Sequence, residues 1–302
     1  MKKKILITGG TGYIGSCLYS FLKMKFDVYI LDKSNLKSWQ KISKKNFYKC
    51  NLLNFKKTKK IINQINPNTI IHLAALSTVN EKFSTKDYLL NNLQVTKNIL
   101  DIMIESKIDN IIFSSTAAVY KNKDKKIDEN SELKPINKYG KSKLQAENII
   151  KEKKLNYIIF RFFNVASAFI NPPIGEFHNP ETHLIPSLIN NLNENKVSKI
   201  FGKNYATNDG TCIRDYIHIK DICRAIYFGI EKIEKKKIKE IINLGNSQGY
   251  SNLEILNSIS KTLKSKIRFN FLKRRKGDNA KLVCDIKKSK KILNWSPNFS
   301  SL

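Results

Sequence analysis

The sequence predicts an α/β protein, built as a doubly wound parallel sheet with a smaller α/β lobe beside it. Three observations lead to this fold class. Residues 4–8 form an apolar run that a glycine-rich turn and a helical segment follow. Apolar runs and helical segments then alternate up to residue 162, which is typical of parallel strands joined by crossover helices. After residue 164 the elements become shorter and proline-containing loops separate them.

The first 164 residues are expected to form the domain that contains the large sheet. Each expected strand is a short apolar run bounded by polar, glycine or proline residues. The expected strands are residues 4–8, 27–31, 46–50, 68–75, 110–116 and 157–162. The expected helices are residues 16–22, 56–65 and 87–106, and a fourth that contains Tyr139 and Lys143. Because open parallel sheets bind ligands at the carboxyl ends of their strands, the functional residues are expected there.

Residues 165–302 are expected to form mainly the smaller lobe, which would bind the substrate, while segments near 210–246 return to the large sheet. The expected helices are residues 184–193, 221–231 and 252–263. The expected strands are residues 199–202, 215–219, 240–244 and 268–272. The sequence contains no recognisable internal repeat.

The formal net charge of +30 raises the question of nucleic-acid binding. The 55 lysines and arginines occur in short groups along the whole chain, without a basic tail or an arginine-rich arm. We therefore interpret the charge as a compositional bias on solvated faces, and expect no nucleic-acid partner. A basic surface would still attract anionic ligands such as nucleotides.

Cysteine spacing and hydropathy limit the other classes of protein. The five cysteines include no Cys-x-x-Cys pair, which argues against a disulfide framework and against a metal site, and favours a reducing cytoplasm. No apolar run approaches the roughly 20 residues that cross a bilayer, so no membrane partner is expected. The apolar run at the N-terminus is too short for a signal peptide.

The pattern Gly9-x-x-Gly12-x-x-Gly15 between a strand and a helix predicts a dinucleotide site. Its glycines allow a tight turn and let backbone N–H groups approach a pyrophosphate at the start of the helix. Asp32 ends the next strand, where a carboxylate accepts hydrogen bonds from ribose hydroxyls and disfavours a 2′-phosphate, so NAD is favoured over NADP. Asn51 and Leu52 follow the third strand at a position suited to the adenine edge.

Tyr139 and Lys143 are four residues apart and would lie on one face of a helix. An ammonium beside a phenol favours the phenolate, so we expect Lys143 to lower the pKa of Tyr139 toward the range of a general base. In a chain this rich in lysine, a surface helix that carries the pair by chance is the alternative.

Motifs along the whole chain carry a family resemblance. In the first lobe they are residues 9–16 (Gly-Gly-Thr-Gly-Tyr-Ile-Gly-Ser), 72–75, 91–92, 114–116 with 119–120, and 139–143. In the second they are residues 163–164, 180–186, 209–211 with 214–218, and 275–278. With these motifs the chain resembles the extended short-chain dehydrogenase/reductase family, and within it the sugar-nucleotide epimerases.

The resemblance implies tightly held NAD and the interconversion of UDP-glucose and UDP-galactose through transient oxidation at sugar C4. Tyr139 would take the proton of the 4-hydroxyl, and Thr116 would bridge the phenol and that hydroxyl. Lys143 would bond the nicotinamide ribose and depress the pKa of Tyr139. A homodimer through the helices that start near Asp87 and Tyr139 is also implied.

The resemblance assigns binding residues as well, with Arg214 and Arg275 gripping the diphosphate. For NAD they are Gly9, Gly12, Tyr13, Ile14, Gly15, Asp32, Asn51, Leu52, Leu73, Ala74, Ala75, Asn91, Ser114, Tyr139, Lys143 and Phe163. For the UDP-sugar they are Thr116, Tyr139, Asn164, His183, Leu184, Phe201, Arg214, Tyr216, Arg275 and Asp278. Core packing is the alternative for Phe201, and a contact through the neighbouring backbone is the alternative for His183.

The chain departs from the family pattern at a few positions. Asn51 stands where aspartate is usual, Lys121 replaces a glycine, and a Gly-Glu-Ser expected near residues 78–82 is not intact. The family usually adds another helix after the position of Leu302. Either the chain is truncated or that helix is dispensable, and we expect an effect on stability more than on chemistry.

Related reactions remain as alternatives. Dehydratases and decarboxylases of this fold usually carry carboxylates after the threonine, whereas Ala117 and Ala118 follow Thr116 here, which favours epimerisation. A net NAD-dependent dehydrogenase would have to exchange its cofactor. Leu282 stands where the family limits the group at sugar C2, and leucine is smaller than the tyrosine of narrow enzymes. A 4-epimerase of UDP-N-acetylglucosamine, or of another UDP-sugar, is therefore the alternative function, and a basic nucleic-acid-binding relative is the non-enzyme alternative.

Overall fold

A seven-stranded parallel sheet forms the centre of the structure, a computed structural model that describes residues 1–77, 83–121, 125–178, 181–275 and 278–300. Its strands run in the order β11-β6-β5-β4-β1-β2-β3. They are β1 (Lys4–Thr8), β2 (Asp27–Asp32), β3 (Phe47–Lys49), β4 (Thr69–His72), β5 (Asn110–Thr116), β6 (Asn156–Phe162) and β11 (Lys239–Leu244). From β1 the chain first builds toward β3 and then toward β11. The order therefore reverses between β1 and β4, where open sheets of this kind bind ligands. The predicted doubly wound fold is confirmed.

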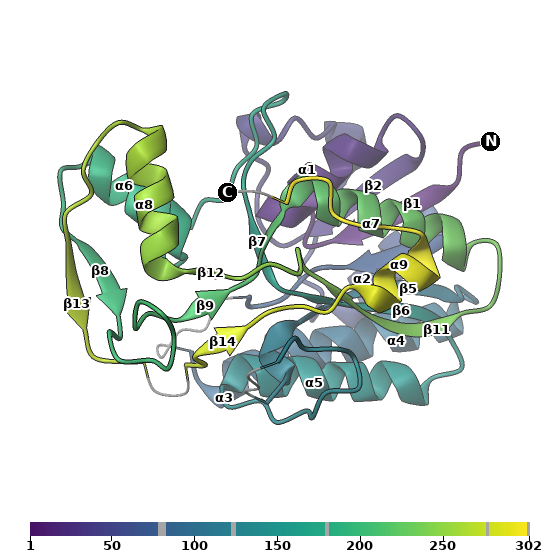
Figure 1. Cartoon of the computed structure of the whole chain (residues 1–302). Coiled ribbons are helices and arrows are strands. Elements are labelled where there is room, and N and C mark those ends of the chain that lie inside the picture. Colours follow the sequence, from purple (N-terminus) through teal and green to yellow (C-terminus); the bar gives the residue numbers. More distant parts are fainter. Residues whose placement is uncertain (78–82, 122–124, 179–180, 276–277, 301–302) are drawn as a thin grey trace.

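Helices cover both faces of the sheet (Figure 1). On one face α1 (Tyr13–Leu22) packs against α7 (Ile219–Ile233), and α9 (Lys287–Leu293) lies beside α7 and β11. On the other face lie α2 (Phe55–Ile65), α4 (Val95–Glu105) and α5 (Lys138–Glu152). Each face has its own apolar core, so the strands between them are buried on both sides.

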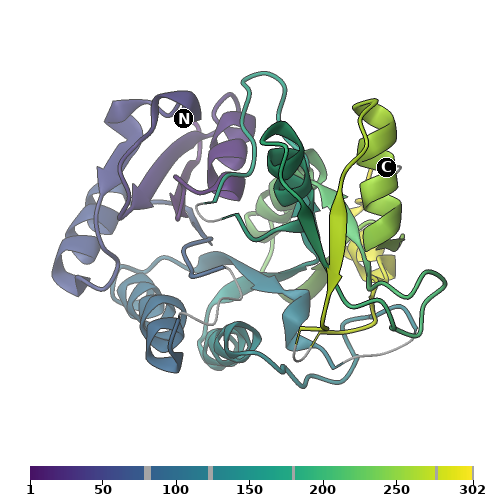
Figure 2. The same ribbon diagram turned by 90° about the vertical axis from the view of Figure 1, so that its left-hand side faces the viewer.

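The smaller lobe stands beside the sheet (Figure 2). It contains α6 (Leu184–Asn193) and α8 (Asn252–Thr262) over the parallel pair β8 (Ser198–Phe201) and β13 (Phe269–Leu272). A separate cluster of buried residues, Leu188, Ile200, Ile255, Leu256 and Ile267, forms its core.

Short strands connect the lobe to the large sheet. β9 (Ile213–Arg214) pairs with β12 (Tyr250–Ser251) and with β14 (Lys281–Leu282), and β7 (Asn164–Ala166) pairs with β10 (Tyr216–His218). Between these pairs the chain runs through α7 and β11, which return to the large sheet. The remaining short helices are η1 (Ser38–Gln40), η2 (Lys44–Asn46) and η4 (Ala117–Val119).

Two sequence-based expectations needed correction. The strand expected at 68–75 is shorter, since β4 ends at His72. The helix expected at 87–106 consists of α3 (Thr85–Tyr88), a π-helical segment η3 (Leu89–Gln94) and α4. The lysine-rich residues 287–291 belong to α9, where Lys287, Lys290 and Lys291 are exposed, in line with charge on solvated faces. In addition, no helix in the described part of the chain is long and apolar enough to cross a membrane.

A buried ion pair ties α5 to the sheet. Glu147 on α5 is 0% exposed and Arg161 on β6 is 1% exposed. Arg161 donates from Nε and Nη2 to the two carboxylate oxygens of Glu147, at 2.9 and 2.6 Å. Ser115 at the end of β5 donates to the same carboxylate, and the Tyr120 hydroxyl accepts from Arg161 Nη1 at 2.8 Å. The charges are thus paired and hydrogen-bonded, which buried ions require.

We predict that Glu147→Gln lowers the free energy of unfolding by about 3–5 kcal/mol, because it leaves the Arg161 charge buried without a counter-charge. Chemical denaturation in urea measures this. Lys153→Gln is the control, because it breaks the exposed pair Lys153–Asp101 (32% and 49% exposed side chains) and should cost less than about 1 kcal/mol. Equal losses in the two variants would contradict the prediction.

Candidate functional site

One cavity of about 1320 Å³ lies at the carboxyl ends of the large sheet and extends to the smaller lobe. Every residue that the sequence analysis assigned to the cofactor or the substrate lines it. Gln40, Glu176 and His178 line it too, although the sequence analysis had not named them as site residues. Residues far apart in the chain therefore converge on one site, and their individual roles remain predictions. The departure near residues 78–82 lies outside the described residues.

At one end of the cavity, the glycine loop packs closely against the residues that follow strand β4. Gly9 has a φ of +72°, and a Cβ there would lie 2.6 Å from the backbone N of Ala74. A Cβ on Gly15 would lie 2.6 Å from Gly9 O. Larger residues at both positions are excluded by backbone atoms. The loop leads into α1, whose first N–H groups point to where a pyrophosphate can bind.

Asp32 is fixed beside this loop. Its carboxylate accepts from the backbone N–H of Thr11 at 3.1 Å and of Ser34 at 2.9 Å. Asn51 also lines the cavity, and its side-chain oxygen accepts from the backbone N–H of Leu53 at 3.1 Å. Two polar side chains are thus presented at the carboxyl ends of β2 and β3, where a ribose and an adenine would lie.

Tyr139 and Lys143 lie in the middle of the cavity, on the first turns of α5. Asn137 caps this helix by accepting from Gly140 N–H at 2.7 Å, and Gly140 packs so closely against Ala118 O that a Cβ would come within 2.4 Å. The cap and this contact fix the start of the helix. Thr116, at the end of β5, forms a hydrogen bond with the Tyr139 hydroxyl.

Lys143 is buried, with 2% of the residue exposed. Its Nζ lies 4.4 Å from the centroid of the Phe113 ring, a cation–π contact. Burial lowers the pKa of Lys143 to about 7, and the Glu147 carboxylate one turn further along opposes this shift. The lysine is therefore only partly charged near neutral pH.

Our expectation that Lys143 lowers the pKa of Tyr139 is wrong for the protein without ligands. Burial raises the pKa of Tyr139 to about 12, the hydrogen bond with Thr116 lowers it, and Tyr88 raises it further. Desolvation of the phenolate is the larger effect, because a half-neutral lysine supplies little opposing charge. A phenolate at this position needs a further positive charge.

Arginines line the other end of the cavity, at the smaller lobe. Arg214 donates to Asp278 Oδ1 at 2.5 Å and to the carbonyl of Asn279 at 2.8 Å. The guanidinium of Arg275 lies 3.9 Å from the centroid of the Phe201 ring. Phe201 thus contacts a cavity arginine and is itself only half-buried, so core packing alone does not describe it. Two guanidinium groups in one cavity wall suit a diphosphate.

The chain matches known proteins along most of its length. Residues 5–245 match the model of the NAD dependent epimerase/dehydratase family. The UDP-glucose 4-epimerase of Halalkalibacterium halodurans is 36% identical over 306 residues, which cover 99% of this chain and 92% of that protein.

Solved structures agree with this. The UDP-glucose 4-epimerase of Brucella ovis in complex with NAD has a TM-score of 0.93 at 31% identity, covering 99% of this chain and 94% of that one. The UDP-Glc/GlcNAc 4-epimerase of Campylobacter jejuni has a TM-score of 0.80 at 30% identity, covering 99% and 95%.

We predict that stability of the ligand-free protein rises with pH because of Lys143. Between about pH 7 and 10.5 the unfolded chain binds a proton on this side chain that the folded protein does not hold. The free energy of unfolding should therefore rise by about 1.4 kcal/mol for each pH unit in this window, relative to Lys143→Met. Urea denaturation near the two ends of the window measures it.

Lys141→Met, which removes an exposed lysine from the same helix, is the matched control and should follow the wild type. Parallel pH curves for wild type and Lys143→Met would contradict the burial of a neutral lysine.

Proposed function

We propose, since this chain belongs to the NAD dependent epimerase/dehydratase family, that it interconverts UDP-glucose and UDP-galactose through transient oxidation at sugar C4. The observation that carries the proposal is the position of Thr116, Tyr139 and Lys143 in one cavity, between the glycine loop and the two arginines. Curated relatives at 31–36% identity over nearly the full length have this activity in their names.

The proposed cofactor is NAD. The residues present fit it: the glycine loop excludes side chains where the pyrophosphate would lie, and Asp32 is placed for the ribose hydroxyls. Bound NAD would supply a reversible hydride acceptor for C4 and a positive ring beside Tyr139. The buried Tyr139 phenol would need such a charge to ionise.

In the proposed reaction Tyr139 takes the proton of the 4-hydroxyl and later returns one. Thr116, which is hydrogen-bonded to the phenol, orients that hydroxyl. Lys143 holds the cofactor ribose and stabilises the phenolate. Arg214 and Arg275 anchor the diphosphate while the keto sugar turns to present its other face, which requires a grip away from the reacting ring.

The cavity supports epimerisation more than elimination. Ala117 and Ala118 line it directly after Thr116, at the position where an elimination would need a carboxylic acid and a base. We also propose a reducing, cytoplasmic location, because the five cysteines are all buried and unpaired.

A homodimer is part of the proposal. Leu89 and Leu90 on η3 are 37% and 39% exposed, and Ile104 on α4 is 48% exposed. These apolar side chains lie on the helices beside α5, where a second copy could cover them. Light scattering should give a mass close to twice 34.8 kDa.

A wider substrate range is the second candidate function. Leu282 lines the cavity and pairs through β14 with Arg214 on β9. A leucine here leaves more room beside the sugar than a tyrosine would. We therefore propose that UDP-N-acetylhexosamines also fit, as the name of the Campylobacter jejuni neighbour indicates for that protein.

We expect purified protein to convert UDP-galactose to UDP-glucose without net formation of NADH. Tyr139→Phe should reduce kcat by roughly 100- to 10,000-fold, because it removes the proton-transfer group, while UDP binding changes little. Coupled product detection and calorimetry measure the two quantities. Tyr227→Phe, on α7 away from the cavity, is the matched control.

Turnover in Tyr139→Phe at the wild-type rate would exclude the proposed role. The wild-type protein should also hold NAD. If it holds none, leaves UDP-galactose unchanged and binds DNA with a steep salt dependence, nucleic-acid binding is the function instead.

We expect wild-type protein to turn over UDP-N-acetylglucosamine as well as UDP-galactose. Leu282→Tyr should lower kcat/KM for the N-acetylated substrate by about 10-fold or more, because the larger ring occupies its space, and should spare UDP-galactose. Leu282→Met conserves volume and should retain both activities. Wild-type turnover of UDP-galactose alone would disprove the wider range.

A further inference from the structure

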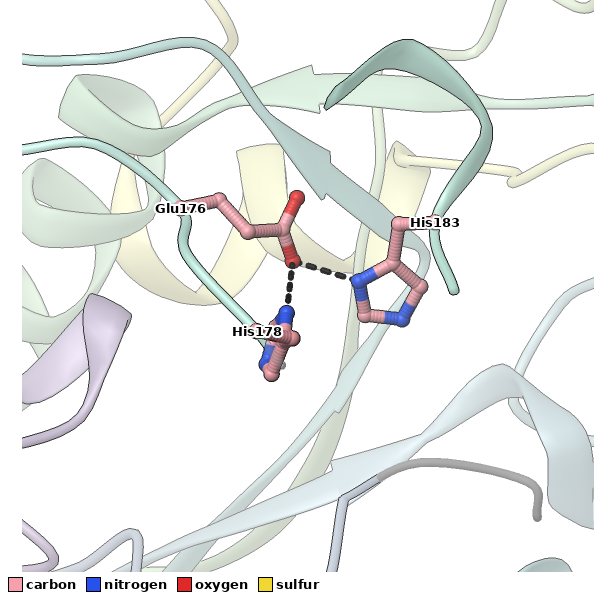
Figure 3. Close-up of side chains that lie close together, drawn as sticks. All are labelled: Glu176, His178 and His183. Atoms are coloured by element: carbon pink, nitrogen blue, oxygen red, sulfur yellow. Dashed lines mark hydrogen bonds and ion pairs between the residues drawn. The ribbon is translucent and has the colours of Figure 1, made fainter. Parts of the chain in front are cut away.

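Three side chains with metal-ligating atoms meet in the cavity wall just before α6 (Figure 3). Glu176 Oε1 lies 2.5 Å from His183 Nδ1 and 3.7 Å from His178 Nδ1. One ligating atom of each residue lies within 4.8 Å of the other two. In Figure 3 both imidazole rings direct a nitrogen toward the same carboxylate.

The hydrogen bond between Glu176 and His183 does not account for His178. Its Nδ1 is buried and has no hydrogen bond among the residues that the structure describes, and the carboxylate oxygens of Glu181 and Glu176 lie 3.5 and 3.7 Å from it. A buried imidazole nitrogen without a partner is costly. A ligand between the three side chains would remove that cost.

The backbone around these residues is held in place by a second carboxylate. Glu181 accepts from the backbone N–H groups of His178, Thr182 and His183, at 3.2, 2.8 and 2.9 Å. Its side chain is only 9% exposed. The two histidines are therefore oriented by contacts that do not depend on a bound ligand.

We propose that Glu176, His178 and His183 form a binding site for a divalent transition-metal ion of the Zn²⁺ class. Two imidazoles and one carboxylate are a donor set that zinc accepts, and they leave one position of a tetrahedron open. Ligand atoms in such a site lie about 3.4 Å apart, as Zn–N bonds of about 2.1 Å require. The separations of 2.5 and 3.7 Å from Glu176 Oε1 to the two histidine nitrogens lie on either side of that value.

The charges around the site favour a cation on balance. Glu176 and Glu181 both face the histidines, whereas Arg275 is the basic group that acts on His183. All three ligands line the cavity, so the open position faces the space proposed for the UDP-sugar. None of the three side chains takes part in the proposed proton or hydride transfer, although His183 is also a predicted contact of the UDP-sugar.

The sequence contains a signal for this metal site that the spacing of the cysteines could not reveal. His178 and His183 are five residues apart, and Glu176 precedes His178 by two. The sequence analysis had expected no metal site.

Absorption spectroscopy with Co²⁺ alone, without nucleotide, tests the proposal. Wild-type protein should bind one Co²⁺ per chain with the intense visible bands of tetrahedral coordination, and one Zn²⁺ should displace it. Glu176→Gln, His178→Gln and His183→Gln should each weaken Co²⁺ binding by at least about 10-fold. His218→Gln, which removes a histidine outside the cluster, should bind like wild type.

The variant His178→Cys distinguishes loss of the metal site from a failure of the protein to fold. It keeps a zinc ligand and should add a thiolate–cobalt band in the near ultraviolet, a gain that unfolding cannot mimic. The proposal is overturned if wild type shows no visible bands, if the bands survive in the Gln variants, or if wild type already shows a thiolate band from its own cysteines.

Discussion

The buried pair between Glu147 and Arg161 fixes the reacting end of the molecule. It joins α5 to β6, and through Ser115 and Tyr120 it reaches β5 and the turn after it. Tyr120 in turn donates to Asn243 on β11 at 2.7 Å. Such a pair adds little net stability, because desolvating two ions costs about as much as their attraction returns. It does define one position of α5 on the sheet, since any other would leave a buried charge unpaired.

That position determines the electrostatics of the site. Glu147 lies one turn after Lys143, so the same carboxylate that holds Arg161 also opposes the loss of the lysine's charge. Burial nevertheless dominates for Lys143 and for Tyr139, and each shifts toward its neutral form. The ligand-free site is therefore close to uncharged at its centre. A positively charged cofactor ring would change this balance, so proton transfer is coupled to cofactor binding.

Much of the fold and of the candidate site could be predicted from the sequence. Apolar runs such as residues 110–116 fix buried strands, and the glycine spacing fixes the loop against Ala74 because backbone atoms exclude any Cβ there. The convergence of Thr116, Tyr139 and Arg214 followed from a family resemblance. What could not be predicted depends on tertiary contacts. In α9, lysines surround the buried Leu293 in the sequence, so the apolar pattern of a helix is not recognisable there. The pKa of Tyr139 is raised mainly by burial, which the sequence does not show.

The π-helical segment η3 limits how the continuous helix formed by α3, η3 and α4 can change in length. Asn92 within it binds Leu76 N–H and O at 2.7 and 3.2 Å, and donates to Ser142 on α5 at 2.9 Å. Each residue of an α-helix turns about 100°. Deleting one residue of η3 to restore regular α-helix would rotate Asn92 away from α5 or shift every later residue of α4 out of its core. The widened turn therefore fixes the number of residues between Ser84 and Val95 that keeps both Asn92 and the buried face of α4 in place.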